Sequence, residues 1–355
     1  MEWWKALRSC IVDMNHLITG GSGFLGNLIM RKLLEQGETV KVLDIWKDDK
    51  HPDDVEFIHC DIRNRDGVNR AMENIDIVHH NVALVPLTKS GKTFWDVNVI
   101  GSQIAAEEAL KAGVQGFIHM SSSALYGAVE QFPINNQTSI NPIEIYGRAK
   151  LAGEEIVSKT LENSNIPLIV IRPRTILGDG RLGIFQILFD WIKDNKNVYV
   201  IGSGNVKFQF VHAHDLMDAY MLAYEIGKSG KYNIGAGSFG TLRNALENII
   251  EYAGSTSQVK SLPINLTITT LTILDWLRLS PLAPWHYLTY HKEFYFDMKP
   301  LIDLGWNPKF SNDEMFRESY DWFINNFDSI KLDDKASAHR QPVKESMLKI
   351  VRWFS

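Results

Sequence analysis

A glycine-rich turn between a predicted strand and a predicted helix constrains the fold of this chain most strongly. Residues 16–19 have the character of the end of a buried strand, and glycines follow at positions 20, 23 and 26. Residues 27–36 then place leucine and isoleucine at the spacing of one helix face. A strand-to-helix turn of this kind brings backbone N–H groups against a pyrophosphate. Its spacing, G-x-x-G-x-x-G, differs from the commoner G-x-G-x-x-G fingerprint.

A second predicted strand and an acidic residue follow this turn in the order that a dinucleotide site requires. Residues 39–43 form the strand, and Asp44 ends it eighteen positions after Gly26. A carboxylate there accepts hydrogen bonds from the hydroxyl groups of an adenosine ribose and repels a 2′-phosphate. The pattern therefore predicts NAD, rather than NADP, as the cofactor. The alternative is a glycine-rich structural turn that binds no ligand.

Strand-like and helix-like segments alternate as far as residue 175. This alternation is typical of an α/β protein with a doubly wound parallel sheet (a Rossmann fold), here with a smaller substrate-binding lobe. Ligands of such folds bind at the carboxyl ends of the strands. Further strands are predicted at 55–59, 75–79, 116–120 and 168–172, and helices at 101–112 and 146–161.

The pattern loosens after Pro173 and divides the chain into four parts. Residues 14–175 are expected to form the NAD-binding domain, with later strands near 208–236 returning to it, and residues 176–327 mainly the substrate-binding lobe. Residues 1–13 are an N-terminal extension, and 328–355 are a C-terminal tail with an amphipathic segment. The apolar stretch 262–279 contains polar and charged residues, so it is a poor membrane span. We interpret it as a core helix, or as an apolar lid near the substrate.

Tyr146 and Lys150 carry the candidate chemistry. They are four positions apart, so they share one face of the predicted helix. A phenol alone titrates near pH ~10, and a neighbouring ammonium lowers its pKa by favouring the phenolate. Serines at 121–123 directly follow the predicted strand 116–120. One serine hydroxyl can hold a substrate oxygen while Tyr146 moves the proton, which suits oxidation of an alcohol or reduction of a ketone.

Together these motifs resemble the extended short-chain dehydrogenases/reductases. This group includes NAD-dependent epimerases and dehydratases and the 3β-hydroxysteroid dehydrogenases. The resemblance runs from about residue 14 to about residue 326. It is carried by Thr19 to Gly26, Cys60 to Ile62, His80 to Ala83, Asn98 to Gly101, Ser121 to Gly127, Tyr146 to Lys150, Arg172-Pro173, and Phe210 to His212 with Asp215.

The resemblance implies roles for the residues that match. Ser122 matches the catalytic Ser/Thr, with Ser121 and Ser123 as supporting hydroxyls. Tyr146 would be the general acid/base, and Lys150 would lower its pKa and hold the nicotinamide ribose. The cofactor contacts implied in this way, or expected from the turn, are Gly20, Gly23, Phe24, Leu25, Gly26, Asp44, Asp61, Ile62, Ala83, Tyr146, Lys150 and Pro173.

Three of the matching residues have alternative interpretations. Asp61, with Ile62, resembles an adenine-contacting pair, but Asp61 could instead cap a helix. Asn98 resembles an active-site structural asparagine and could equally be a satisfied core amide. Asp215 lies in a segment whose role in the family is largely structural, so we leave it out of the catalytic set.

Departures from the family pattern bear on the substrate. Sugar-nucleotide dehydratases usually carry an Asp-Glu pair after the catalytic Ser/Thr, where this chain has Ser123 and Ala124, so we disfavour dehydration. Thr175 stands where many nucleotide-sugar enzymes have an asparagine, and Phe208 where many have an arginine that grips a diphosphate. Three other cations are candidates for that grip, namely Arg174, Arg181 and Lys207.

The expected substrate is a small molecule, either a nucleotide sugar or a lipophilic alcohol. A nucleotide-sugar epimerase is the first interpretation, by weight of the family. A 3β-hydroxysteroid-type or other lipophilic-alcohol dehydrogenase is the second, because residues 291–308 resemble the sterol branch (and some epimerases). The apolar stretch 262–288 suits a hydrophobic substrate or ordinary packing. A non-catalytic NAD-binding scaffold is the third, and the intact Ser/Tyr/Lys set argues against it.

Composition and the chain ends bear on partners and location. A net charge of −5 argues against general nucleic-acid binding. Two cysteines supply neither a disulfide framework nor a cysteine metal site, and we expect no metal. Residues 1–13 lack a secretory pattern, so we expect a cytoplasmic protein. We also expect a homodimer without a membrane span, whose amphipathic segment at 343–354 contacts a membrane surface or docks on a subunit.

Overall fold

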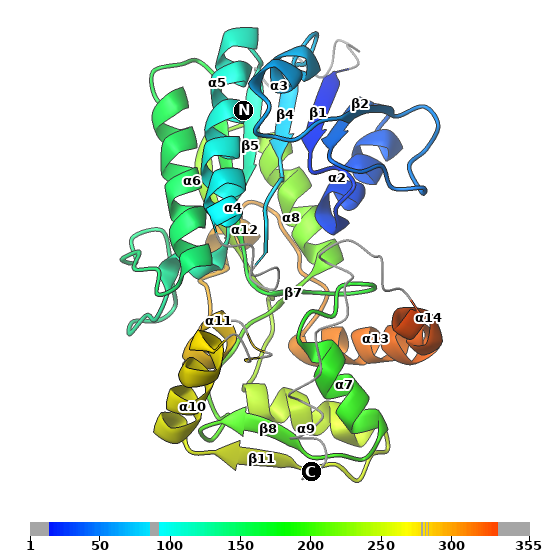
Figure 1. The fold of residues 1–355 in the computed structure, drawn as a ribbon, viewed down its shortest axis with the longest axis vertical. Coiled ribbons are helices and arrows are strands. Elements are labelled where there is room, and N and C mark those ends of the chain that lie inside the picture. The colour runs from blue at the N-terminus through cyan, green and yellow to red at the C-terminus, as the bar shows by residue number, and fades with distance from the viewer. Residues whose placement is uncertain (1–13, 86–91, 278–279, 281, 283, 333–355) are drawn as a thin grey trace.

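A seven-stranded parallel sheet is the centre of the molecule (Figure 1). The structure is a computed structural model that describes residues 14–85, 92–277, 280, 282 and 284–332. The strands lie in the spatial order β10-β6-β5-β4-β1-β2-β3. Their bounds are β1 (Asn15–Thr19), β2 (Thr39–Asp44), β3 (Glu56–His59), β4 (Ile77–His80), β5 (Gly116–Met120), β6 (Leu168–Pro173) and β10 (Gly230–Ile234).

Helices cover both faces of this sheet, as the predicted doubly wound fold requires. Leu17 and Ile18 are adjacent in β1, and they belong to two different buried clusters, one on each face. The first layer contains α2 (Phe24–Glu35) and α8 (Ala213–Ile226), and the second contains α3 (Arg65–Ala71), α5 (Ser102–Ala112) and α6 (Ile145–Leu161). The fold class predicted from the sequence is confirmed.

The strand order reverses between β1 and β4. The chain runs outward from β1 through β2 to β3, and then crosses back to β4 and onward through β5 and β6 to β10. A crevice forms at the carboxyl ends of strands where two halves of a parallel sheet diverge in this way. The glycine turn after β1 and the serines after β5 both lie at this edge.

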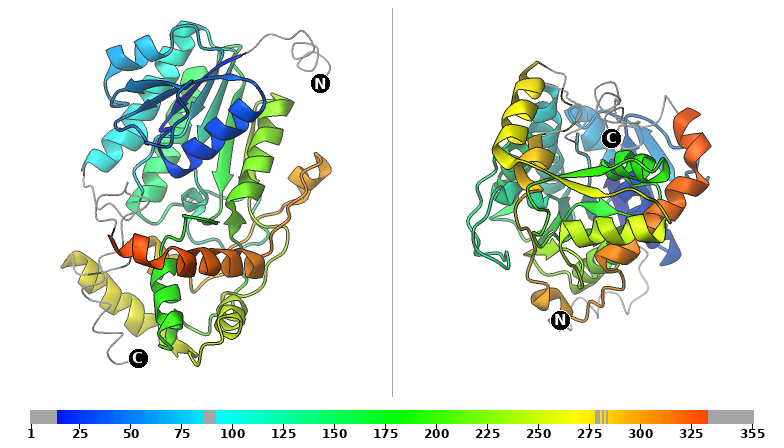
Figure 2. Two further views of the ribbon diagram at one scale, coloured as in Figure 1. Left: turned by 90° about the vertical axis from the view of Figure 1, so that its right-hand side faces the viewer. Right: turned by 90° about the horizontal axis from the view of Figure 1, so that it is seen from below.

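The remaining elements form a smaller part below the carboxyl edge of the sheet (Figures 1 and 2). It contains two short parallel strand pairs, β8 with β11 and β7 with β9. Its strands and helices are β7 (Ile176–Leu177), α7 (Phe185–Lys193), β8 (Val198–Ile201), β9 (Val211–His212), α9 (Leu242–Tyr252), β11 (Val259–Leu262), α10 (Ile264–Trp276), α11 (Pro284–Thr289), α12 (Lys299–Asp303), α13 (Asn312–Asn325) and α14 (Phe327–Leu332). Between β4 and α5 lie α4 (Lys92–Trp95) and a π-helix (Asp96–Gly101), and a 3₁₀ turn (Ser123–Tyr126) follows β5.

Two predictions about the later half of the chain need correction. Of residues 208–236, only β10 joins the main sheet, whereas β9 pairs with β7 in a separate sheet. Of the apolar stretch 262–279, residues 264–276 form α10, which is not a core helix because it has no buried residue. Its apolar side chains surround the helix instead of forming one stripe, and Trp276 is 82% exposed.

Several predictions about chain ends and membranes are outside what the structure tests. Residues 1–13 and the amphipathic segment 343–354 lie outside the described residues. Within the described part of the chain, no helix combines the length and the apolar character needed to cross a bilayer. The division into an NAD-binding domain and a substrate-binding lobe stays a prediction.

Candidate active site

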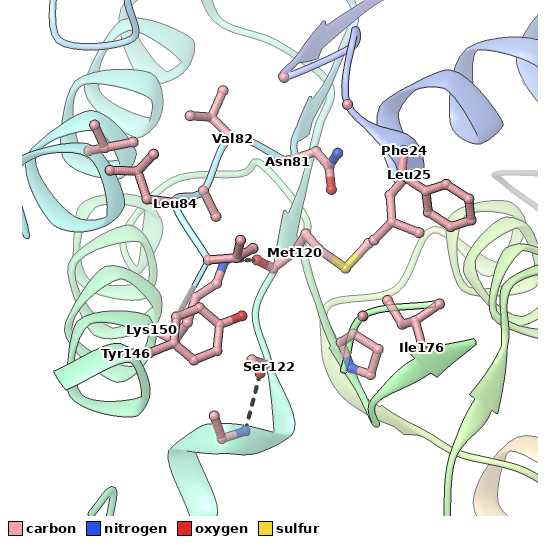
Figure 3. A pocket seen from close by; sticks show the side chains of 18 of the residues that line it. Phe24, Leu25, Asn81, Val82, Leu84, Met120, Ser122, Tyr146, Lys150 and Ile176 are labelled. Atoms are coloured by element: carbon pink, nitrogen blue, oxygen red, sulfur yellow. Dashed lines mark hydrogen bonds between the residues drawn. The ribbon is translucent and has the colours of Figure 1, made fainter. Parts of the chain in front are cut away.

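A cavity of about 590 Å³ lies between the carboxyl edge of the sheet and the smaller part of the molecule. Its upper wall contains the glycine turn, Asp44 and the Ser/Tyr/Lys set, and its lower wall contains aromatic side chains. Figure 3 shows Ser122, Tyr146 and Lys150 on one side of it and Phe24 and Leu25 on the other. Every predicted site residue except Gly26 lines this cavity, and Gly26 belongs to the turn at its wall. The sequence therefore predicted one connected site.

The glycine turn is packed so tightly that side chains would not fit. Gly20 has a φ of +73°, and a Cβ on it would lie 2.9 Å from the backbone nitrogen of Val82. A Cβ on Gly26 would lie 2.2 Å from the carbonyl oxygen of Gly20. Gly23 is the N-cap of α2 and offers no side chain to the first N–H groups of that helix. The turn thus leaves a side-chain-free cradle at a helix N-terminus, which fits a dinucleotide pyrophosphate.

Asp44 ends β2 at the wall of the cavity. Its Oδ2 accepts a hydrogen bond from Ser22 N at 3.1 Å, and its Oδ1 accepts one from Ile45 N at 2.7 Å. Burial raises the pKa of the carboxyl group, against these backbone hydrogen bonds, which lower it. The side chain is therefore fixed by the backbone at the place predicted for the adenosine ribose.

Asp61 pairs with Arg63 and does not cap a helix. Its carboxylate accepts hydrogen bonds from Arg63 Nε at 2.9 Å and Arg63 Nη2 at 2.6 Å, and this pairing lowers its pKa. The N-cap of α3 is Asn64, whose Oδ1 accepts a hydrogen bond from Gly67 N at 3.2 Å. The helix-capping alternative for Asp61 is therefore wrong. Ile62, Ala83 and Pro173 line the cavity as well.

Ser122 and Tyr146 meet in the cavity. Ser122 follows β5, and its Oγ accepts a hydrogen bond from Ala124 N at 3.2 Å. The Ser122 hydroxyl is also a polar neighbour of the Tyr146 phenol and lowers the phenol pKa. Burial outweighs this effect, so the pKa of Tyr146 is raised overall. The carboxylate of Glu144 fixes the start of α6 by accepting hydrogen bonds from the backbone N–H groups of Tyr146 and Gly147, both at 2.6 Å.

Lys150 lies on the same face of α6 as Tyr146, as predicted, and its side chain is hydrogen-bonded to the backbone of β5. Its Nζ donates a hydrogen bond to Met120 O at 2.8 Å, and burial lowers its pKa to about 8, against the charge of Glu154 one turn later. The pKa of Tyr146 is raised overall and Lys150 is not among the groups that lower it here, so the lowering expected from Lys150 stays a prediction. The charge of Arg181 opposes the rise instead.

The supporting polar residues have distinct partners. Ser121 Oγ donates to Glu154 Oε2 at 2.8 Å, while Ser123 Oγ accepts from Arg174 Nη1 at 3.1 Å. Asn98 is a satisfied amide that positions a wall of the cavity. Its Oδ1 accepts from Leu84 N at 2.8 Å, and its Nδ2 donates to Leu84 O at 3.1 Å.

Three residues contribute to the catalytic site although they were not assigned to it from the sequence. Glu144 caps α6, and an acid two positions before Tyr146 at a predicted helix start was the available signal. The charge of Glu154, one helical turn after Lys150, favours the charged form of that lysine, and the four-residue spacing was visible in the sequence. Arg181 lies above the ring of Phe24, 5.8 Å from its centroid, and its charge acts on the phenol of Tyr146. It is brought there by a loop far along the chain, which no spacing rule predicts. Of the other candidate diphosphate grips, Arg174 lines the cavity, whereas Lys207 is exposed beside the ring of Tyr295.

The sheet, the switch point and the glycine turn define a class, the dinucleotide-binding α/β proteins of the extended short-chain dehydrogenase/reductase type. The chain belongs to the NAD-dependent epimerase/dehydratase family, whose model matches residues 16–235. NAD is the cofactor after which this family is named, so the predicted cofactor is confirmed. Among the described residues, no group of three His, Cys, Asp or Glu side chains could hold a metal ion.

Individual relatives span much of the chain. An uncharacterized protein of Sinorhizobium fredii, y4nG, is 41% identical over 94% of this chain and 85% of its own. The sterol-4-alpha-carboxylate 3-dehydrogenase (decarboxylating) of Mus musculus is 30% identical over 59% of this chain and 58% of its own. Among solved structures, a UDP-glucose 4-epimerase of Thermotoga maritima with UDP-glucose is similar at a TM-score of 0.73 and 23% identity, over 88% of this chain and all of that one.

Proposed function

We propose that this protein oxidises a secondary alcohol, or reduces the corresponding ketone, with Tyr146 as the proton-transferring residue. The observation that carries the proposal is that one cavity brings together Ser122, Tyr146, the glycine turn and Asp44, with the Ser122 hydroxyl lowering the pKa of the phenol. NAD, when bound, supplies the hydride acceptor. The glycine turn would hold its pyrophosphate, Asp44 its adenosine ribose and Lys150 its nicotinamide ribose.

The chain's own residues handle the proton and the oxygen. The Ser122 hydroxyl donates a hydrogen bond to the substrate oxygen and holds it beside the phenol. Tyr146 accepts the hydroxyl proton as the carbinol carbon is oxidised, and returns a proton to the same oxygen when the ketone is reduced. Lys150 lies one helical turn away, where its positive charge would favour the phenolate that accepts the proton.

A nucleotide-sugar epimerase is the first specific proposal. In that reaction the ketone stays in the site and rotates to present its other face before Tyr146 returns the proton. The fold is shared with a UDP-glucose 4-epimerase, which supports an epimerase reaction. Dehydration of a sugar would need acidic groups at positions 123 and 124, where this chain has serine and alanine. A homodimer is part of the same proposal, and size-exclusion chromatography with light scattering tests it.

A dehydrogenase of lipophilic alcohols is the second proposal, and a specific observation favours it. The lower wall of the cavity contains Leu182, Ile184, Phe185 and Trp285. The exposed apolar helix α10 lies next to α11, which carries Trp285. The named sterol dehydrogenase among the relatives acts on a substrate of this class, and in this reaction the ketone leaves the site.

Two measurements separate these proposals. Protein purified under native conditions is denatured, and the released nucleotide is identified; tightly held NAD that does not exchange with added NAD supports the epimerase. The melting temperature of the NAD-saturated protein is then measured in the presence of UDP- or GDP-sugars and, separately, of sterols. A ligand that binds only the folded state raises this temperature. Absence of NAD binding would contradict the general proposal, and stabilisation by neither ligand class would contradict both specific ones.

A further inference from the structure

Arg174 is a buried cation in the wall of the active-site cavity. Its side chain is 1% exposed, and it lines the cavity together with Ser123. Its Nε donates to Gln209 O at 2.9 Å and its Nη1 to Ser123 Oγ at 3.1 Å, while its Nη2 has no hydrogen-bond partner among the described residues. The guanidinium packs against the rings of Phe294 and Phe208, whose centroids are 3.9 and 4.8 Å away.

Arg172, two positions earlier, shows how the same strand end accommodates an arginine with a structural role. It is equally buried, but its Nε and Nη2 donate to the two carboxylate oxygens of Glu154, and its Nη1 donates to the Tyr126 hydroxyl at 2.8 Å. No described carboxylate pairs with Arg174 in this way; the neighbouring group that favours its charge is Tyr290. Burial of a charge without a counter-ion is strongly unfavourable, so the missing anion of Arg174 needs an explanation.

The contacts of Arg174 limit where this anion would lie. Nη1 is held at Ser123, and the preceding residue, Ser122, lines the same cavity as Tyr146. The guanidinium therefore lies beside the place where the reacting oxygen is held. An anion that meets Nη2 there belongs to a part of the substrate only a few bonds from the reacting carbon, and not to a remote group.

We propose that Arg174 and Ser123 bind a carboxylate of the substrate, attached close to the secondary alcohol that Ser122 and Tyr146 hold. The planar guanidinium offers parallel N–H groups that match the two oxygens of a carboxylate. This inference rests on the proposed function and narrows its substrate to a carboxylated one. In the epimerase that substrate is a uronic acid within a nucleotide sugar, and in the dehydrogenase it is a lipophilic hydroxy acid.

The first test needs no substrate. A buried charge without a counter-ion costs free energy, so its replacement by an apolar side chain of similar length should be neutral or stabilising. Removal of one partner of a buried ion pair is destabilising. Arg174→Met should therefore leave the melting temperature of the NAD-saturated protein unchanged or raise it. Arg172→Met, the matched control, should lower it because the buried carboxylate of Glu154 loses its bidentate partner and keeps only Lys231 and Ser121. An equal loss in both variants would show that Arg174 is structural and would overturn the proposal.

The second test compares ligands that differ only in the carboxylate. The pairs are UDP-glucose with UDP-glucuronic acid, and a 3β-hydroxysterol with its 4α-carboxylate. The wild type should bind the carboxylated member of one pair about tenfold more tightly or better, since hydrogen bonds to charged groups have that magnitude. Arg174→Met should lose this preference, and Arg174→Lys should keep part of it.

The outcomes separate the inference from the function on which it rests. Binding of NAD is measured alongside by fluorescence titration with the reduced cofactor. If the cofactor binds normally, equal affinities within both pairs, or an unchanged preference in Arg174→Met, would overturn the carboxylate assignment alone. If the cofactor binds normally but none of the four ligands binds, the carboxylate assignment and both specific substrate proposals fail, while the proposed oxidoreduction does not. Failure to bind the cofactor would contradict the proposed function itself.

Discussion

Tyr146 is controlled at the scale of single residues by neighbours that act in opposite directions. Burial raises its pKa, and the carboxylate of Glu144 adds to the rise, while the Ser122 hydroxyl and the charge of Arg181 lower it. Alcohol oxidation requires the phenolate. Because the phenol pKa is raised, the rate of oxidation should increase as the pH rises above neutrality.

Arg181→Met should shift the increase of the oxidation rate to a higher pH. Loss of the cation removes one influence that stabilises the phenolate, so the pKa of Tyr146 rises and the same fraction of phenolate is reached only at a higher pH. The pH dependence of kcat measures the displacement. Arg148→Met, which removes an exposed cation from α6, the helix that carries Tyr146, is the control. Equal profiles for Arg181→Met and the wild type would refute the assigned influence.

Asp44 determines the choice of nucleotide at the same scale. Its carboxylate is fixed at the cavity wall by two backbone N–H groups. Asp44→Ala should reduce the affinity for NAD and erode the preference over NADP by about tenfold or more, because a hydrogen-bonding acceptor and a repulsive charge are both lost. Titration of both cofactors measures this ratio. A ratio equal to that of the wild type would be inconsistent with the role of Asp44.

At the scale of elements, α6 depends on its first turn. Glu144 accepts hydrogen bonds from two N–H groups that would otherwise be unsatisfied at the buried helix start. Glu144→Ala should therefore lower the free energy of unfolding by about 1–2 kcal/mol. Urea denaturation measures this loss, with Glu155→Ala on the exposed side of α6 as the control. Equal stability of the two variants would contradict the capping role.

Periodicity and spacing predicted the elements of the sheet well and those of the smaller part less well. Residues 116–120 and 168–172 were predicted as strands because short apolar runs alternate with helical patterns, and both strands exist within a residue of those bounds. Apolar composition alone, in contrast, could not distinguish a core helix from the exposed α10. That difference depends on which neighbours pack against the helix, and local sequence does not encode it.

The exposure of α10 has a measurable consequence. Leu266 is 67% and Trp276 is 82% exposed, so their apolar surfaces contribute little to the folded state. Leu266→Ser and Trp276→Ser should each change the free energy of unfolding by less than about 0.5 kcal/mol. Leu246→Ser in α9, where the side chain is buried, should cost several times more. A large loss for either α10 variant would show that the helix is packed in solution.

At the scale of the whole molecule, the sheet contains buried neutral histidines. His79, His80 and His119 lie in β4 and β5, and burial lowers the pKa of each, for His119 to about 3. The unfolded chain takes up protons at these residues below pH ~6.5, while the folded protein does not. Stability should therefore be full above that pH and fall as the pH decreases toward 3.

His119 offers a direct test of this acid sensitivity. Its two ring nitrogens have no hydrogen-bond partner among the described residues, and its ring stacks on that of His80. His119→Phe should flatten the dependence of the unfolding free energy on pH between 6 and 4 by about 1.4 kcal/mol per pH unit, the value for one proton. His59→Gln, at an exposed position of β3, should leave the slope unchanged. The same slope in His119→Phe and the wild type would contradict this explanation.

The catalytic role of Tyr146 is tested most directly by one comparison of Tyr146→Phe with the wild type. The phenylalanine keeps the ring and its edge-to-face contact with Phe94, but it removes the hydroxyl that moves the proton. Single-turnover formation of reduced cofactor is followed by absorbance, with the ligand that most stabilises the wild type as substrate. The rate should fall by about 10²–10⁴-fold, the contribution typical of a general acid/base, while NAD affinity stays within about twofold. A Tyr146→Phe variant with the rate of the wild type would contradict the central claim.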